Sequence, residues 1–138
     1  MNSYRWEDLS VGMSATFETC FTGQMVRDFA AISGDTNPLH VDAEYATAAG
    51  FPGPVVFGMM TASLYSQLVG VHLPGRFALL EGIDIHFNAP CFPGDVLTVR
   101  GEIVFKSESF KRVEIKARIH KQDGKLASKA LIRVGLHA

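Results

Sequence analysis

The stretch "GMMTASLYSQLVGV", residues 58 to 71, is the most apolar segment of the chain that can form a helix. Its apolar side chains are spread around most of a helical circumference, which is typical of a helix buried inside a protein. No Asp, Glu, Lys or Arg occurs between Glu44 and Arg76. We therefore expect one central helix over residues 58–71, surrounded by protein on nearly all sides, with the rest of the fold built around it.

This uncharged region is long enough to raise the question of a membrane-spanning helix, which needs roughly 20 apolar residues, but its uninterrupted part, residues 55–73, is barely of that length. Residues 50–54 interrupt it at the front with two glycines and two prolines, and Pro74 with Gly75 closes it at the rear. The stretch between these breaks also carries two serines, a glutamine and a histidine. The pattern favours a helix within a soluble fold over a helix that crosses a membrane.

Downstream of this helix the periodicity changes to that of β-strands. Four segments alternate between apolar and polar residues, over 77–87, 96–105, 112–120 and 126–136, and Asp123-Gly124 is a strong hairpin signal between the last two. The side chains expected on the apolar faces are Leu79, Ile83, Ile85 and Phe87, then Leu97, Val99, Ile103 and Phe105, then Val113, Ile115, Ala117 and Ile119. Each strand therefore has one wet face and one face to bury.

The segment before the central helix predicts one further strand and two further helices. Residues 13–21 are rich in Thr and Phe and alternate loosely, as a strand does. Thr22 can cap a helix that runs to about Ser33, with Gly34 as its stop. Its apolar spacing is carried by Met25, Phe29 and Ile32. A short helix over 43–49 can be capped by Asp42.

Together these elements define an α+β fold. An antiparallel sheet with one wet face must bury its other face, and the helix over 58–71 is the only element apolar enough to cover it. We expect residues 1–138 to form a single domain in which a curved antiparallel sheet of about five strands grips the central helix. The open edges of such a sheet are usually covered or paired. We therefore expect a homodimer in which two sheets join edge to edge.

Composition excludes some classes of partner. The 138 residues are 47% hydrophobic and 20% charged, as in an ordinary soluble protein, and the net charge of −1 gives no reason to expect nucleic acid or an anionic membrane as partner. The beginning "MNSYRWEDLSVGM" is polar with charges of both signs, unlike a secretory signal. Cys20 and Cys91 each lie among apolar residues, which predicts buried reduced thiols in a cytoplasmic protein.

The loop "AAISGDTNPLHVD", residues 30 to 42, holds an aspartate, an asparagine and a histidine within six positions. Its Asn-Pro step disfavours continued helix, so the chain should fold back in a tight bend. Such a bend can aim the carboxylate of Asp35 and the imidazole of His40 at one spot. Turn chemistry alone is the alternative interpretation. A metal would need further ligands, and no such cluster is evident, so we expect no metal.

Three stretches resemble the hotdog-fold (R)-specific enoyl-CoA hydratases, the MaoC-like dehydratase family. The stretch "SGDTNPLHVD" fits the family's Asp-x-Asn-Pro-x-His motif. The stretch "FPGPVVFGMMTASLYSQLVG" is similar to the family's loop and central helix, and "FNAPCFPGDVLTV" to its Phe-x-x-Pro and Gly-Asp corner. The resemblance covers nearly the whole chain. One departure is Phe57, where many members have a histidine, and it bears on the substrate pocket more than on the chemistry.

The resemblance implies a lyase that needs no cofactor. It would add water reversibly, in the syn sense, to a trans-2-enoyl thioester of coenzyme A or acyl carrier protein, giving the (3R)-hydroxyacyl product. Asp35 and His40 would hold the catalytic water, with Ser66 nearby. Asn37 would orient the pair or hold the bend, and we favour the structural role. The free N–H of Gly58 at the helix start would stabilise the thioester oxygen, although Gly58 can also serve close packing alone. Family members form dimers, so each site should lie near a subunit boundary.

Two other interpretations stay open. The same fold houses acyl-thioester hydrolases, but those generally lack the Asp-x-Asn-Pro-x-His bend, and Ser66 lacks the Gly-x-Ser-x-Gly setting of a nucleophile. A protein that binds acyl thioesters without turnover is the other, and Phe57 keeps it open. The remaining polar candidates, Asp84, His86, His72, His120 and His137, are expected at the surface. The sequence alone does not indicate the length or branching of the acyl chain, or whether its carrier is coenzyme A or acyl carrier protein.

Overall fold

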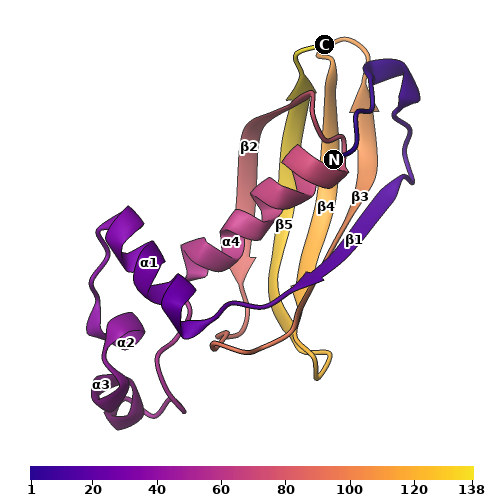
Figure 1. Ribbon diagram of the computed structural model, residues 1–138. Coiled ribbons are helices and arrows are strands. Elements are labelled where there is room, and N and C mark those ends of the chain that lie inside the picture. Colours follow the sequence, from indigo (N-terminus) through magenta and orange to yellow (C-terminus); the bar gives the residue numbers. More distant parts are fainter.

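A five-stranded antiparallel sheet curves around one helix in the computed structural model, which describes residues 1–138 (Figure 1). The strands are β1 (Ser14–Thr19), β2 (Ala78–Phe87), β3 (Leu97–Ser107), β4 (Arg112–His120) and β5 (Leu126–Leu136). Their order in the sheet is β1-β3-β4-β5-β2, and every neighbouring pair is antiparallel. The first and second strands of the sequence are therefore the two edges. The predicted α+β class and the predicted strands are confirmed.

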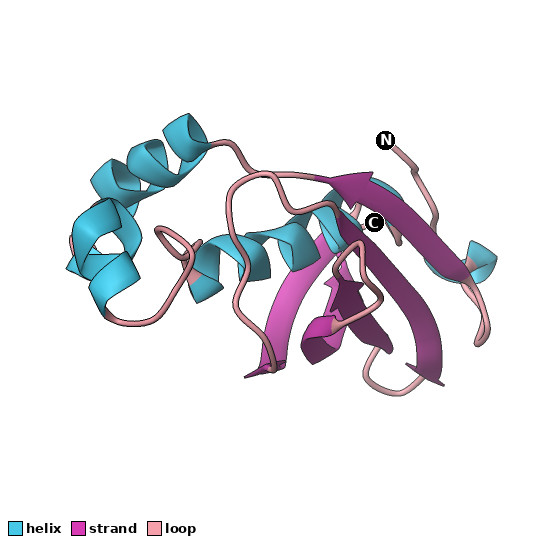
Figure 2. Cartoon of the chain, turned by 90° about the horizontal axis from the view of Figure 1, so that it is seen from below, coloured by secondary structure: helices cyan, strands magenta, loops and turns pink.

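The central helix, α4 (Gly58–Gln67), continues as a π-helical turn, η2 (Leu68–His72), so the chain is helical over nearly the predicted range. It lies in the hollow of the sheet, as Figure 2 shows. The remaining helices are the 3-10 turn η1 (Trp6–Asp8), α1 (Gly23–Ser33), α2 (Pro38–Val41) and α3 (Ala43–Ala48). The last three gather beyond the amino end of α4 (Figure 1). None of these helices has the length and hydropathy needed to cross a bilayer.

The core lies between the inner side of the helix and the concave face of the sheet. Its fully or almost fully buried members include Met60, Leu64, Leu68, Val99, Ile103, Ile115, Ile119 and Ile132. One hydrogen bond crosses this layer, 2.7 Å between the Tyr65 hydroxyl and the Ser128 hydroxyl. Burial raises the pKa of Tyr65 to about 12, so the phenol stays protonated.

The outer side of α4 is not covered within one chain. Met59 is 66% exposed, and Ser63, Ser66 and Gln67 are exposed as well. The expectation that protein surrounds this helix on nearly all sides is wrong for a single chain, because one sheet can contact only one side of a cylinder. A strip of mixed polarity, defined by these four residues, faces outward.

A β-bulge at Glu81 changes which face β2 presents to the core. Leu80 pairs with Val134, and the register then shifts by one residue before Ile83. Residues directly opposite each other share a face of an antiparallel sheet. Leu80 therefore shares the concave face with Ile83, and the prediction that Leu79 does so is wrong. An extra residue in one strand exchanges the two faces for all side chains beyond it. A prediction that assumes strict alternation of apolar and polar residues cannot detect this exchange.

A second bulge, at Val104, has the same effect in β3. It brings Phe105 opposite Glu114 on the convex face, where the phenyl ring is 52% exposed. The prediction that Phe105 belongs to the core is therefore wrong. Lys106 turns to the concave side instead, and its Nζ donates hydrogen bonds to two carbonyls of the N-terminal segment at 2.9 and 2.8 Å.

The first long helix buries a different face from the one its sequence suggested. Met25 is 46% and Ile32 81% exposed, whereas Val26 and Ala30 are buried and Phe29 is half-buried. Thr22 caps the helix as predicted, since its hydroxyl accepts a hydrogen bond from the Met25 N–H. The apolar contact of α1 therefore runs along the neighbouring stripe of the helix.

The two cysteines lie in different surroundings, and both are free thiols. Cys20 follows β1 and is exposed, so the expectation that it is buried is wrong. Cys91 is buried as expected. Burial raises the pKa of the Cys91 thiol.

The ring of one histidine expected at the surface is partly buried. His72, the last residue of η2, stacks on Phe17 with ring centroids 4.7 Å apart, and its Nε2 is buried without a hydrogen-bond partner. His120 is half-buried, whereas His137 is exposed as predicted.

Candidate active site

The loop after α1 holds its aspartate by local hydrogen bonds. Gly34 ends the helix in the left-handed conformation, with φ 73°. Asp35 comes next, and its Oδ1 accepts a hydrogen bond of 3.0 Å from the Asn37 N–H. The turn interpretation of this carboxylate is thus correct for one oxygen. The second oxygen, Oδ2, has no partner in the chain.

Asn37 and Pro38 start a one-turn helix within the predicted bend. The side chain of Asn37 accepts a hydrogen bond of 3.0 Å from the Leu39 N–H, and proline stands at the first helical position, where its missing N–H costs nothing. This helix, α2, carries His40. Asn37 therefore holds the bend together, which is the role favoured from the sequence.

His40 is fixed in one tautomer and one plane. Its Nδ1 lies 2.6 Å from the Val55 carbonyl oxygen. A carbonyl can only accept, so Nδ1 carries the proton and Nε2 of the neutral ring presents a lone pair. The imidazole stacks on the Phe57 ring with centroids 4.0 Å apart and an interplanar angle of 27°. Phe57 is itself 2% exposed and packs on Phe29, so this position orients the imidazole.

The amino end of α4 offers unpaired backbone donors. Phe57 caps it without a side-chain hydrogen bond, and its carbonyl accepts from Met60 and Thr61. The N–H groups of Gly58 and Met59 have no backbone acceptor. Such free donors carry the partial positive charge of a helix start and attract a developing anion.

Gly58 also meets a neighbouring side chain closely. A Cβ added at this position would lie 3.3 Å from the nearest atom of the Phe87 ring. Close packing requires that position 58 carry no Cβ, whereas stabilisation of an oxyanion requires its free N–H. The two interpretations of Gly58 are therefore compatible.

A cavity of about 320 Å³, which we call the reaction cavity, brings the predicted groups together. Its lining residues are Phe29, Ser33, Asp35, His40, Phe57, Gly58, Met59 and Phe87. A carboxylate, an imidazole with a free lone pair and a helix start with free N–H groups thus meet on one space with aromatic walls. This arrangement can polarise a water and stabilise an oxyanion beside it.

Ser66 does not join this group within one chain. It lies on the exposed strip of α4 and lines neither the reaction cavity nor the cavity beside it. Sequence reasoning missed the wall residues Phe29, Met59 and Phe87. For Phe87 a signal existed, since it opens the Phe-x-x-Pro stretch, but its assignment to the apolar face of β2 gave no hint that it faces a cavity.

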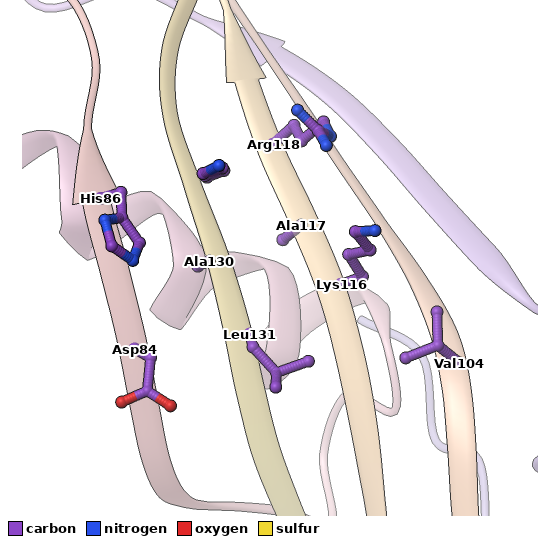
Figure 3. Close-up of a pocket in the computed structure, with 9 residues that line it drawn as sticks. Asp84, His86, Val104, Lys116, Ala117, Arg118, Ala130 and Leu131 are labelled. Carbon is purple, nitrogen blue, oxygen red and sulfur yellow. The ribbon is translucent and has the colours of Figure 1, made fainter.

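A further hollow, of about 550 Å³, lies on the convex face of the sheet (Figure 3). Asp84 and His86 on β2, together with Lys116 and Arg118 on β4, stand around it. Both β2 residues are exposed as predicted, and Asp84 pairs with Arg133 at 3.0 Å. The hollow has no helix start to supply backbone donors, and the sheet separates it from α4. Nowhere in the chain do three or more His, Cys, Asp or Glu side chains converge as metal ligands would.

Comparison with known proteins defines the class. Residues 10–124 match the family model of the MaoC like domain, and the chain therefore belongs to the MaoC-like dehydratase family. It is 38% identical over 121 residues to an (R)-specific enoyl-CoA hydratase of Aeromonas caviae. The aligned residues cover 88% of this chain and 90% of that protein. It is 34% identical over 98 residues to a 3-hydroxybutyryl-CoA dehydratase of Methylorubrum extorquens, covering 71% and 62% respectively. These relatives are hydro-lyases.

Solved structures agree on the fold. The (R)-hydratase of Aeromonas caviae superimposes with a TM-score of 0.90 at 37% identity, covering 94% of this chain and 98% of that one. The unliganded (R)-hydratase of Pseudomonas aeruginosa gives a TM-score of 0.89 at 30% identity, covering 95% and 84%. The helix in the curved sheet is thus the hotdog fold.

A further relative by sequence is a mitochondrial 3-hydroxyacyl-[acyl-carrier-protein] dehydratase of Arabidopsis thaliana. It is 34% identical over 87 residues, which cover 63% of this chain and 51% of that protein.

Proposed function

We propose that this protein is an (R)-specific enoyl-thioester hydratase. It adds water reversibly and in the syn sense to a trans-2-enoyl thioester and yields the (3R)-3-hydroxyacyl thioester. The observation that carries the proposal is the reaction cavity, where Asp35, His40 and the free N–H of Gly58 meet. The names of the relatives extend the substrate class to thioesters of coenzyme A or acyl carrier protein.

The water is the nucleophile in this proposal. The free Oδ2 of Asp35 accepts one of its hydrogens, and the lone pair on Nε2 of His40 accepts the other. As the water oxygen bonds to C3, an O–H bond breaks and its proton passes to this pair. The π electrons of the double bond move towards the thioester. Positioned acid–base groups of this kind contribute on the order of 10²–10⁴ in rate.

The thioester oxygen takes up the negative charge that leaves the double bond. We place it at the amino end of α4, against the N–H groups of Gly58 and Met59. One such donor is worth on the order of 10²–10³ in rate, because it is already oriented and needs no reorganisation. Return of a proton from the Asp35–His40 pair to C2 completes the reaction. Both new bonds form on the face of the substrate that looks at this pair, which gives syn addition.

We further propose a homodimer. Strand β2 is an open edge of the sheet, and Leu80 on it is 49% exposed. The outer strip of α4, with Met59, is uncovered as well. Pairing of two β2 edges would extend the sheet and bring the strip of each helix, including Ser66, towards the partner. Sedimentation at micromolar concentration tests this; a monomer under those conditions would contradict it.

The activity is tested by the loss of enoyl-thioester absorbance. Asp35→Asn and His40→Ala should each lower kcat/KM on the order of 10²–10⁴-fold, because each removes one holder of the water. The matched controls are Asp84→Asn and His86→Ala, an aspartate and a histidine on the convex face, which should keep near-normal rates. Near-normal rates of the first pair would refute the site assignment.

Two further outcomes would favour the alternative functions. Release of free thiol from a saturated acyl-CoA would point to a hydrolase. Tight binding without any hydration would point to a protein that carries acyl thioesters.

A further inference from the structure

One aromatic side chain, that of Phe87, lines two neighbouring cavities at the amino end of α4. Phe87 is the last residue of β2 and lies opposite Ser128, whose side chain is buried on the concave face. Its ring therefore faces the helix, where it approaches Gly58. The ring is nevertheless 52% exposed, which is unusual for an aromatic side chain on the inner face of this sheet.

The second cavity, which we call the side cavity, measures about 260 Å³. It is lined by His40, Val55, Val56, Gly58, Thr61, Phe87, Asn88, Ala89, Pro90 and Cys91. It shares three of these with the reaction cavity, namely His40, Gly58 and Phe87. The boundary between the two cavities therefore consists of these three residues.

Phe87 is the least constrained part of this boundary. His40 is tied to the Val55 carbonyl and stacked on Phe57, and Gly58 contributes nothing but backbone. Phe87 makes no hydrogen bond through its side chain, and rotation about two torsions is enough to displace its ring. Of the three boundary residues, Phe87 is therefore the one that the fewest contacts hold in place.

The far wall of the side cavity is held in place. The Val56 N–H donates a hydrogen bond of 2.8 Å to the Cys91 carbonyl. Asn88 and Ala89 both donate to the Ala127 carbonyl, at 2.8 and 3.2 Å. Because this wall is fixed to β5 and to the segment before α4, the volume behind Phe87 persists whichever way the ring turns.

We propose that Phe87 determines the acyl chain length of the substrate by closing the side cavity. This inference rests on the proposed hydratase function and names the substrate range of that site. With the ring in place, the reaction cavity admits short acyl chains. Methylene groups beyond the reacting carbons need the side cavity, whose walls of Val55, Val56, Ala89 and Pro90 are apolar and suit a saturated chain. A smaller side chain at position 87 joins the two spaces into one.

Each newly buried methylene improves binding about fourfold. In Phe87→Ala the ratio of kcat/KM for octenoyl-CoA over crotonyl-CoA should rise at least about tenfold, and Phe87→Leu should fall between this variant and the wild type. The matched control is Phe105→Ala, since Phe105 is also 52% exposed but lies on the convex face. Its ratio should equal that of the wild type. A ratio of two substrates measured in one preparation does not depend on the fraction of folded enzyme.

Calorimetry separates failure of this inference from failure of the proposed function. The affinity ratio of octanoyl-CoA over butanoyl-CoA should rise in Phe87→Ala even if the protein hydrates nothing. If the wild type hydrates enoyl thioesters and neither ratio changes by more than twofold in Phe87→Ala, the role of Phe87 is refuted and the hydratase proposal stands. If no enoyl thioester is hydrated but the affinity ratio rises, the role of Phe87 holds for binding and the hydratase proposal falls.

Discussion

At its amino end the central helix leaves the N–H groups of Gly58 and Met59 without acceptors, whereas at its carboxyl end the chain takes up the carbonyls itself. The Asn2 N–H donates to the Val71 carbonyl at 2.8 Å, and the Asn2 side chain donates to the His72 carbonyl at 2.7 Å. The first end opens on two cavities, and the second is closed by the N-terminal segment.

This difference shows how one helix can serve stability and chemistry at once. Unpaired backbone groups are tolerated only where water or a ligand can reach them, since burying them unpaired costs free energy. At the closed end the carbonyls of Leu68, Val69, Val71 and His72 all accept hydrogen bonds from the chain. The open end keeps its donors free, so it can interact with an anion that the chain itself does not supply. Four substitutions test this difference between the two ends.

The largest expected effect is the loss of a donor at the open end. Gly58→Pro removes the N–H, while the helix should persist, because proline is favoured at the first helical position and Phe57, with φ −55° and ψ 135°, has the conformation that precedes proline. We expect kcat for enoyl-thioester hydration to fall on the order of 10²–10³-fold. Gly58→Ala is the control, since it adds a Cβ near Phe87 but keeps the donor. Equal losses in both variants would show that packing, not the N–H, matters here.

At the closed end, a substitution should affect stability and leave the chemistry intact. A Cβ at Gly101 would lie 2.6 Å from Leu68 Cδ2 and 3.0 Å from Ile115 Cγ2. Gly101→Ala should therefore lower the free energy of unfolding by about 2 kcal/mol, as overpacking does. Gly70→Ala is the control, because nothing lies within 4 Å of its added Cβ. That variant should gain about 0.5 to 1 kcal/mol by urea unfolding. An unchanged free energy of unfolding in Gly101→Ala would mean that this end is loosely packed.

The segment that follows the wall of the side cavity is held by a carboxylate, since Asp95 Oδ2 accepts a hydrogen bond of 2.8 Å from the Phe92 N–H. Burial by itself raises the pKa of Asp95, but hydrogen bonds from Gln122, the Phe92 N–H and Lys121 outweigh it, so the pKa lies below its ordinary value. A lowered pKa stabilises the fold above the ordinary pKa of about 3.9, and that stability is lost as the pH falls through the pKa of the folded state.

Asp95→Asn should therefore cost about 1.5 kcal/mol of unfolding free energy at pH 7. The difference between variant and wild type should shrink as the pH is lowered from 5 towards 3. Urea unfolding across this range measures it, with Glu44→Gln, an exposed carboxyl on α3, as the control. A constant difference over the whole range would exclude ionisation of Asp95 as its cause.

The smallest expected effect concerns the thiols. Cys20 is exposed, whereas Cys91 lines the side cavity with a pKa raised by burial. The thiolate is the reactive form, so Cys91 should react with a disulfide reagent at pH 7.5 at least about tenfold more slowly than Cys20. In a native titration one thiol should react quickly, and Cys20→Ser should abolish that phase. Rapid labelling of both thiols would show that the side cavity opens widely to solvent.

Much of the fold follows from local pattern. The apolar run from Gly58, the period-two segments after Pro74 and the turn at Asp123-Gly124 each report on neighbours within a few residues, and they give the helix, the strands and the sheet class. The bulges at Glu81 and Val104 are not readable in this way. An extra residue is set by strand pairing, so Leu79 and Phe105 were predicted on the wrong face.

The candidate site likewise has a part that the local sequence predicts and a part that it does not. The sequence by itself determined its chemical groups, since Asp35, Asn37 and His40 lie in one short loop whose turn residues fix its course. What these groups face depends on contacts between distant segments. The Phe57 ring against the imidazole and Phe87 between two cavities join segments distant along the chain, and such contacts depend on packing that no local period encodes.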